Sequence, residues 1–145
     1  MTLAIYEGTS GSDLPFSTGA MFTNAFTATF DGRVGGTEDF LLYLRNSNVL
    51  YTYSDITIQA YQSEGSIDLV EGTQGFSFKM KAGDAEPTSE EWASIQAGNT
   101  ISLSDLEDII TYLPFWVRIE VPRQVPVQRF RGVSFKIIAT QNLVE

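Results

Sequence analysis

The chain has 145 residues, of which 43% are hydrophobic and 12% aromatic, and its formal net charge is −9. This composition indicates one folded domain rather than a disordered chain. The negative charge argues against binding to nucleic acid or to an anionic membrane. The chain contains no Cys and no His, so it has no disulfides, no thiolate metal ligands and no histidine base. We therefore expect no enzyme, no cofactor and no metal site.

No apolar run approaches the ~20 residues that are needed to cross a bilayer. The first residues also lack the basic segment and apolar block of a secretion signal. From these observations we expect a protein that is made in the cytoplasm and does not contact a membrane.

Residues 1–19 are expected to form an N-terminal arm in front of a β-sandwich domain at 20–145. The arm has apolar residues among Gly, Ser, Thr, Asp and Pro, which favour irregular backbone. It is either a surface-packed terminus or an arm that docks onto a neighbouring subunit. In the second case, deleting 1–19 should weaken docking without unfolding the sandwich. The candidate anchors of the arm are Leu3, Ile5, Tyr6 and Phe16.

Two segments with clean alternation of side chains, 22–30 and 38–45, are predicted strands. In the second segment, Leu41 and Tyr43 lie opposite the inward-facing residues, of which Leu42 is one. Apolar residues on both faces indicate a central strand, or a strand with one face covered by a partner. We therefore take Leu41 and Tyr43 as candidate partner-binding residues.

The middle of the chain continues with short strands separated by turn residues, which is typical of an all-β sandwich. The predicted strands span 49–53, 56–61, 67–69, 76–80 and 101–103. One short helix is predicted after Thr88, because Glu91 completes a capping box, and Gly98 is expected to end it. Residues 105–112 fit either a short helix or a bulged strand.

Residues 114–140 are predicted to form two further strands joined by a crossover that contains Pro122 and Pro126. In both strands, every second residue is apolar, so each can press one face into a core. The complete pattern predicts a single antiparallel β-sandwich, Ig-like or jelly-roll-like, of about 8–10 strands with one short helix.

The sequence contains no phosphate-binding loop, dinucleotide fingerprint or nucleophile elbow. A glycosidase with paired carboxylates needs only Asp and Glu, but nothing in the sequence pairs two of them. Trp92, Trp116 and the tyrosines could stack on sugar rings. Aromatic residues also dominate cores and protein interfaces, and this interpretation is favoured here.

Three passages together resemble an Ig-like sandwich of structural proteins in tailed bacteriophages. They are FLLYLRNSNVLYTYSDITIQA, PTSEEW and FWVRIEVP…RFRGVSFKIIAT, and the resemblance covers roughly residues 38–140. It implies a non-enzymatic virion protein, most simply a capsid decoration (cement) protein that binds and stabilises the assembled head. The implied partner is the major capsid protein or another virion protein, and the implied oligomer is a homotrimer. The alternative is a carbohydrate-binding or host-recognition module of the tail or neck.

Overall fold

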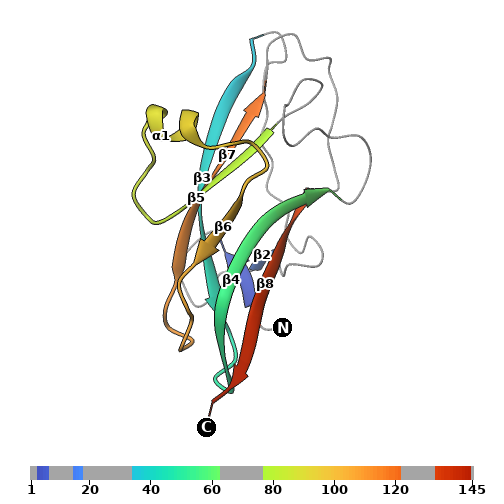
Figure 1. Cartoon of the computed structure of the whole chain (residues 1–145), viewed down its shortest axis with the longest axis vertical. Helices are drawn as coiled ribbons and strands as arrows, with labels where there is room; N and C mark the ends of the chain where they lie inside the picture. Colours follow the sequence, from blue (N-terminus) through green and yellow to red (C-terminus); the bar gives the residue numbers. More distant parts are fainter. Residues whose placement is uncertain (1–2, 7–14, 18–33, 63–76, 122–132, 145) are drawn as a thin grey trace.

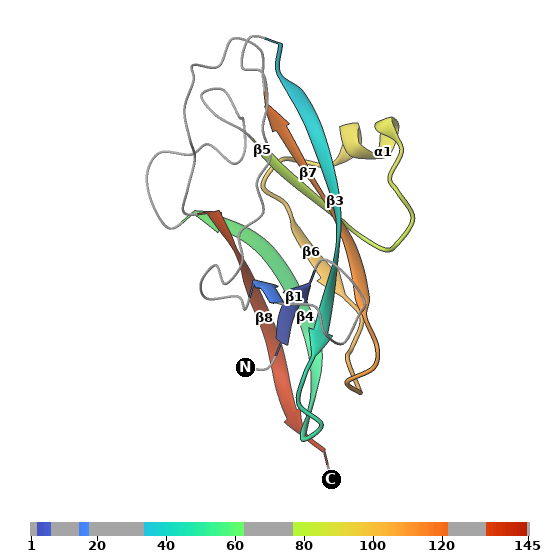
Figure 2. The ribbon, with the colours of Figure 1, turned by 180° about the vertical axis from the view of Figure 1, so that it is seen from behind.

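The computed structural model describes residues 3–6, 15–17, 34–62, 77–121 and 133–144. These residues form two antiparallel sheets packed face to face, with one short helix (Figures 1 and 2). The strand orders are β2-β1-β3-β7-β5 and β6-β4-β8. The elements are β1 (Leu3–Tyr6), β2 (Pro15–Ser17), β3 (Gly36–Asn46), β4 (Tyr51–Gln62), β5 (Ser77–Ala82), α1 (Ser89–Ser94), β6 (Thr100–Leu103), β7 (Leu113–Val121) and β8 (Val133–Leu143). The predicted all-β sandwich is confirmed.

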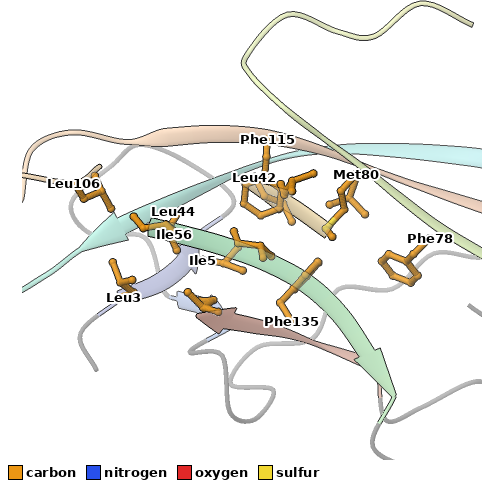
Figure 3. Packing of buried hydrophobic residues seen from close by; sticks show 14 of the residues in the cluster. Leu3, Ile5, Leu42, Leu44, Ile56, Phe78, Met80, Leu106, Phe115 and Phe135 are labelled. Carbon is orange, nitrogen blue, oxygen red and sulfur yellow. The ribbon is translucent and has the colours of Figure 1, made fainter. Parts of the chain in front are cut away.

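The core lies between the two sheets and is filled by inward-facing residues of β1 and of β3 to β8 (Figure 3). Alternation explains this arrangement, because successive side chains of a strand point to opposite faces. Three aromatic rings of the core meet edge to face: the ring centroid of Phe135 lies 6.3 Å from that of Phe78 and 6.1 Å from that of Phe115. The sheets are therefore joined by apolar packing.

Two predicted strands, 49–53 and 56–61, are a single strand, β4, in the structure. The pairing with β8 shifts register between Ser54 and Thr57, and Asp55 adopts a positive φ of 52°. This irregularity interrupts the alternation, which is why the sequence pattern indicated two strands.

Residues 105–112 form neither a helix nor a strand, apart from one bridge between Leu106 and Tyr53. The predicted strands at 22–30 and 67–69 lie outside the described residues.

The start of the predicted arm is a strand of the chain's own sheet. β1 pairs with β3, and both Leu3 and Ile5 are 0% exposed in the core. This pairing and burial argue against the expectation that deleting 1–19 leaves the sandwich folded. Burial of a Leu or Ile side chain is worth about 1.5–3 kcal/mol, so the deletion removes much of a marginal stability.

Helix α1 begins as predicted and ends earlier than predicted. Thr88 accepts a hydrogen bond from the backbone N–H of Glu91, whose side chain accepts one from the backbone N–H of Thr88. The helix ends at Ser94 with Ile95 as its C-cap. Gly98 instead uses its positive φ of 75° in the turn that follows, and its N–H donates to the carbonyl oxygen of Phe78 at 2.6 Å.

The loop before β7 is held by Asp108, whose carboxylate accepts hydrogen bonds from the backbone N–H groups of Ile110 and Thr111. The hydrogen bonds from Thr111 are the main reason why the pKa of Asp108 is lowered. Because the pKa is lowered on folding, the ionised carboxylate stabilises the folded loop at pH values above its unfolded-state pKa of about 3.9. The stabilisation is lost as the pH falls through the lower folded-state pKa. We expect an NMR titration to place this pKa below that of Asp108 in the urea-unfolded chain, and equal values would contradict the loop geometry.

Candidate protein-binding face

The outer face of the five-stranded sheet carries a row of large side chains from adjacent strands. Across this face, Tyr6 of β1 lies opposite Tyr43 of β3, which lies opposite Pro114 of β7. One step along the strands, Leu41 of β3 lies opposite Trp116 of β7. Cross-strand neighbours of this kind touch each other. The segments 3–6 and 113–121 flank β3, so their outward side chains form one continuous row with those of β3.

Tyr6 and Tyr43 form a compact group with Arg45 of β3 and with Tyr112, which directly precedes β7. We call these four side chains the tyrosine–arginine cluster. The guanidinium carbon of Arg45 lies 4.5 Å from the ring centroid of Tyr6 and 4.7 Å from that of Tyr112. The rings of Tyr43 and Tyr112 are 6.4 Å apart at an interplanar angle of 77°. One planar cation thus contacts two rings, and a third ring packs edge-on against one of them.

This geometry makes the cluster stiff while it remains partly accessible. All four side chains are partly buried rather than covered. A cation over an aromatic face contributes about 0.5–1 kcal/mol at exposed sites. An edge-to-face ring pair adds about 0.5–1.5 kcal/mol beyond burial. A preorganised surface loses little side-chain entropy when a partner binds, so the arrangement suits protein recognition.

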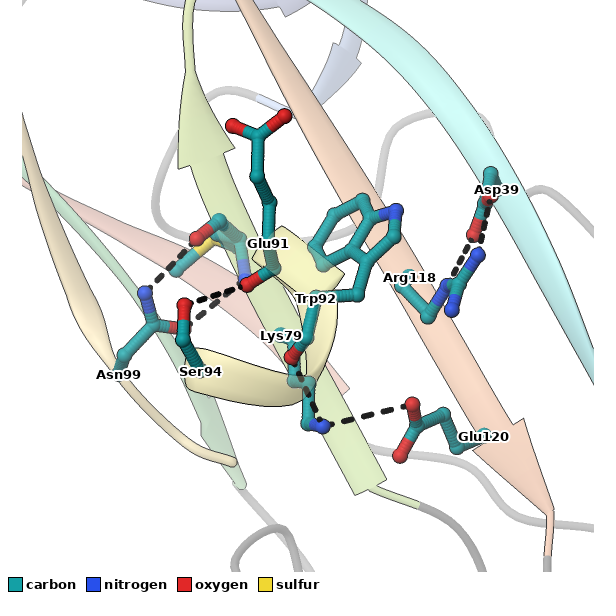
Figure 4. Close-up of polar contacts among 9 residues, drawn as sticks. Asp39, Lys79, Glu91, Trp92, Ser94, Asn99, Arg118 and Glu120 are labelled. Carbon is teal, nitrogen blue, oxygen red and sulfur yellow. Dashed lines mark hydrogen bonds and ion pairs between the residues drawn. The ribbon is translucent and has the colours of Figure 1, made fainter. Parts of the chain in front are cut away.

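Farther along the same face, α1 covers β5 and β7 with the side chain of Trp92 (Figure 4). Trp92 is 1% exposed, and the guanidinium carbon of Arg118 lies 4.9 Å from its ring centroid. Arg118 also donates two hydrogen bonds to Asp39, from Nε at 2.7 Å and from Nη2 at 2.9 Å. The hydrogen bonds to Asp39 raise the pKa of Arg118 above its ordinary value, against the opposing effect of burial. Arg118 therefore stays charged and serves to hold the helix.

The helix is held by further polar contacts from β5 (Figure 4). Lys79 Nζ donates to the carbonyl oxygen of Trp92 at 3.2 Å and pairs with Glu120 of β7 at 3.4 Å. Lys81 pairs with Glu91 of the helix. Together with the contact of Arg118 on Trp92, these contacts attach α1 to β5 and β7, so this half of the face has a structural role.

The structure brings together some of the residues that the sequence singled out and separates others. Tyr6 and Tyr43 belong to the cluster, and Leu41 lies on the same face. Leu3 and Ile5 are buried in the core. Phe16 lies on β2, and its side chain is outside what the structure describes.

Sequence reasoning missed Arg45 and Tyr112. Arg45 follows Tyr43 by two residues on a strand, so the alternation already placed both side chains on one face. No comparable signal existed for Tyr112. It lies just before β7 in a segment with no regular pattern, and only the packing of that segment brings it to the cluster.

The described ranges contain no group of three or more acidic side chains that could hold a metal ion. The same residues include no helix that is long and apolar enough to span a membrane. Comparisons with protein-family models, with curated proteins and with solved structures find no match for this chain.

Proposed function

We propose that the protein is a non-enzymatic structural protein of a bacteriophage virion, a decoration protein that binds and stabilises the assembled head. The observation that carries this proposal is the tyrosine–arginine cluster on the outer face of the larger sheet. Tyr and Arg are enriched in protein interfaces and dominate their energetic hot spots. The resemblance of residues 38–140 to phage Ig-like sandwiches supports a virion location, and the β-sandwich architecture is compatible with it.

Binding alone would produce the stabilisation. A protein that binds the assembled shell and not its free subunits favours assembly by RT ln(1 + [L]/Kd) at each site. Many copies on one shell multiply this effect. No bond has to be made or broken, which agrees with a chain that lacks both His and Cys.

The direct test is binding to purified heads of the phage that encodes the chain. Tyr43→Ala and Arg45→Ala should each weaken binding about 30-fold or more, because loss of a hot-spot residue costs about 2 kcal/mol or more. Cosedimentation with heads over a range of protein concentrations measures this change. The mass of the free protein in solution distinguishes the homotrimer implied by the family resemblance from the dimer inferred below.

Matched controls come from the opposite sheet. Thr57→Ala and Ser102→Ala change outward-facing side chains of β4 and β6 and should leave head binding unchanged. If the wild-type chain does not cosediment with heads, the decoration function is wrong. If it binds but both cluster variants bind equally well, another surface makes the contact.

The alternative, a sugar-binding module, has less support from the geometry. Trp92 is buried and one face of its ring is covered by Arg118, so it cannot stack on a pyranose. Trp116 is partly exposed on the outer face, but its Nε1 is already bonded to the carbonyl oxygen of Asp84 at 3.0 Å. Glycan-array binding that disappears in Trp116→Ala would establish the alternative and argue against the decoration protein.

A further inference from the structure

The outermost strands of the two sheets differ in how their free edges are protected. β2 and β6 have three and four residues, respectively, and short edges are poor templates for pairing. The edge of β5 is occupied: the Asn99 side-chain amide accepts from Met80 N at 2.9 Å and donates to Met80 O at 2.8 Å. β8 has 11 residues, and no strand within the described ranges pairs with its outer side.

The C-terminal half of β8 also lacks the residues that normally prevent edge-to-edge pairing. Ile137–Val144 contains no charged residue, no Pro and no Gly. Ile138, Leu143 and Val144 are 52%, 70% and 50% exposed, respectively. Figures 1 and 2 show this half of β8 running along the border of the molecule to its narrow end. A long, uncharged and apolar edge is a template for another strand.

We infer that this edge pairs with the β8 edge of a second copy of the chain, giving an antiparallel dimer with one continuous sheet β6-β4-β8-β8-β4-β6. One hydrogen bond and the alternation along β8 fix the directions of the backbone groups. Val144 N–H donates to Leu50 O at 2.9 Å, so Val144 faces β4. By alternation, Thr140 and Asn142 also face β4. Ala139, Gln141 and Leu143 therefore direct their N–H and C=O groups to the free edge.

One register makes this edge self-complementary. If Gln141 lies opposite Gln141 of the second copy, Ile138 lies opposite Val144 and Ala139 opposite Leu143. The backbone N–H and C=O groups of Ile138 and Val144 point to β4 of their own copy. Across the dimer, Ile138 of one copy and Val144 of the other therefore form a non-hydrogen-bonded pair, in which side chains approach most closely. Two-fold symmetry repeats each contact. A shift of two residues in one direction sets Val144 against Lys136, and in the other direction sets it against Thr140.

Symmetry also explains why a second copy is the fitting occupant. In a two-fold pair, a charged residue at the edge meets its own kind or lies near it, and the chain carries a net charge of −9 that opposes association in general. Ile137–Val144 is free of that repulsion. Each copy supplies both the exposed Ile138 and the exposed Val144 that the other copy covers.

Sedimentation of the full chain at millimolar concentration should show a dimer. Leu143→Pro should make it monomeric, because Pro removes an N–H that faces the edge and not β4. Leu143→Ala keeps that N–H and should weaken the dimer less. Circular dichroism and thermal melting check that both variants stay folded. A monomeric wild-type chain, or a dimer that survives in folded Leu143→Pro, would overturn the inference.

Cross-linking tests the register, since the natural chain has no Cys. Gln141→Cys should form a disulfide-linked dimer under mild oxidation, because directly opposite Cα atoms in a hydrogen-bonded pair are about 5.5 Å apart. Thr140→Cys should cross-link poorly. In the proposed register residue 140 lies opposite residue 142, so the two copies of residue 140 are diagonal neighbours and lie farther apart than directly opposite residues. Efficient cross-linking of Thr140→Cys alone would overturn the proposed pairing. All of these variants lie on the smaller sheet, away from the tyrosine–arginine cluster. Their readouts are the mass and the cross-linking of the free protein, so a failure of the dimer is distinguishable from a failure of head binding.

Discussion

Replacing Trp92 by alanine is expected to lower the free energy of unfolding by about 3–5 kcal/mol, the usual cost of truncating a buried Trp. Its side chain is 1% exposed between α1 and the outer face of the sheet. The substitution also uncovers Arg118, whose guanidinium packs on the ring while it is paired to Asp39. Urea denaturation followed by circular dichroism measures the loss.

Two related variants sharpen this prediction. Trp92→Phe should cost less than Trp92→Ala, because Nε1 of Trp92 has no hydrogen-bond partner among the described residues and phenylalanine keeps most of the apolar contact. Trp116→Ala, on the same face but partly exposed, is the matched control and should cost less than Trp92→Ala. Equal losses for the two alanine variants would mean that α1 does not seal this part of the sheet.

Asn46→Ala is expected to destabilise the protein by about 2–3 kcal/mol, because it leaves several backbone groups of the turn between β3 and β4 without a partner. Asn46 is 1% exposed, and its Nδ2 donates to Tyr51 O at 2.7 Å and to Asn48 O at 3.1 Å. Its Oδ1 accepts from Asn48 N at 3.0 Å. The amide thus replaces a strand partner where the chain reverses direction.

The control for this prediction lies two residues away. Asn48 accepts one hydrogen bond, from Leu50 N, in an exposed part of the same turn. Asn48→Ala should therefore cost only about 0.5–1.5 kcal/mol, the net value of an ordinary hydrogen bond. Thermal or urea unfolding compares the two variants. If Asn46→Ala is as mild as Asn48→Ala, water satisfies the turn and the buried amide is not needed.

The two arginines of the outer face have different roles, although both stack on aromatic rings. Arg118 is paired in a two-point contact with Asp39, and each of these side chains is 18% exposed. Such an arrangement is structural, since breaking it leaves a partly buried charge. Arg45 lies between tyrosines that remain partly accessible. Substitutions at Arg45 should therefore affect binding more than stability, and substitutions at Arg118 the reverse.

A dimer through β8 would leave the tyrosine–arginine cluster of each copy uncovered, because the cluster belongs to the other sheet. Two clusters in one particle allow bivalent binding to a repetitive surface. The second contact then forms at a high effective concentration, so avidity exceeds the affinity of either site. A head made of repeated subunits presents such a surface.

Local patterns predicted most of the strands and the direction of their side chains. The alternation in β3 and β7 placed Leu42, Phe115 and Val117 inward, and all three are buried. The capping box of Thr88 and Glu91 marked the start of α1. The pattern failed at the irregularity near Asp55, because an extra residue changes the alternation without any marker residue. It also failed to show that β7 and β8, which follow each other in sequence, lie in different sheets.

The sequence by itself determined that this chain forms an all-β sandwich without histidine or cysteine chemistry, since alternation and composition are local properties. Only the tertiary structure decided which side chains share a surface and which strand edges lie free among the described residues. Arg45 meets Tyr6 and Tyr112 through pairing between distant segments, and the edge of β8 is exposed because no described strand is placed beside it. Which strands become neighbours depends on how all the apolar faces are buried together, and no short stretch of sequence contains that information.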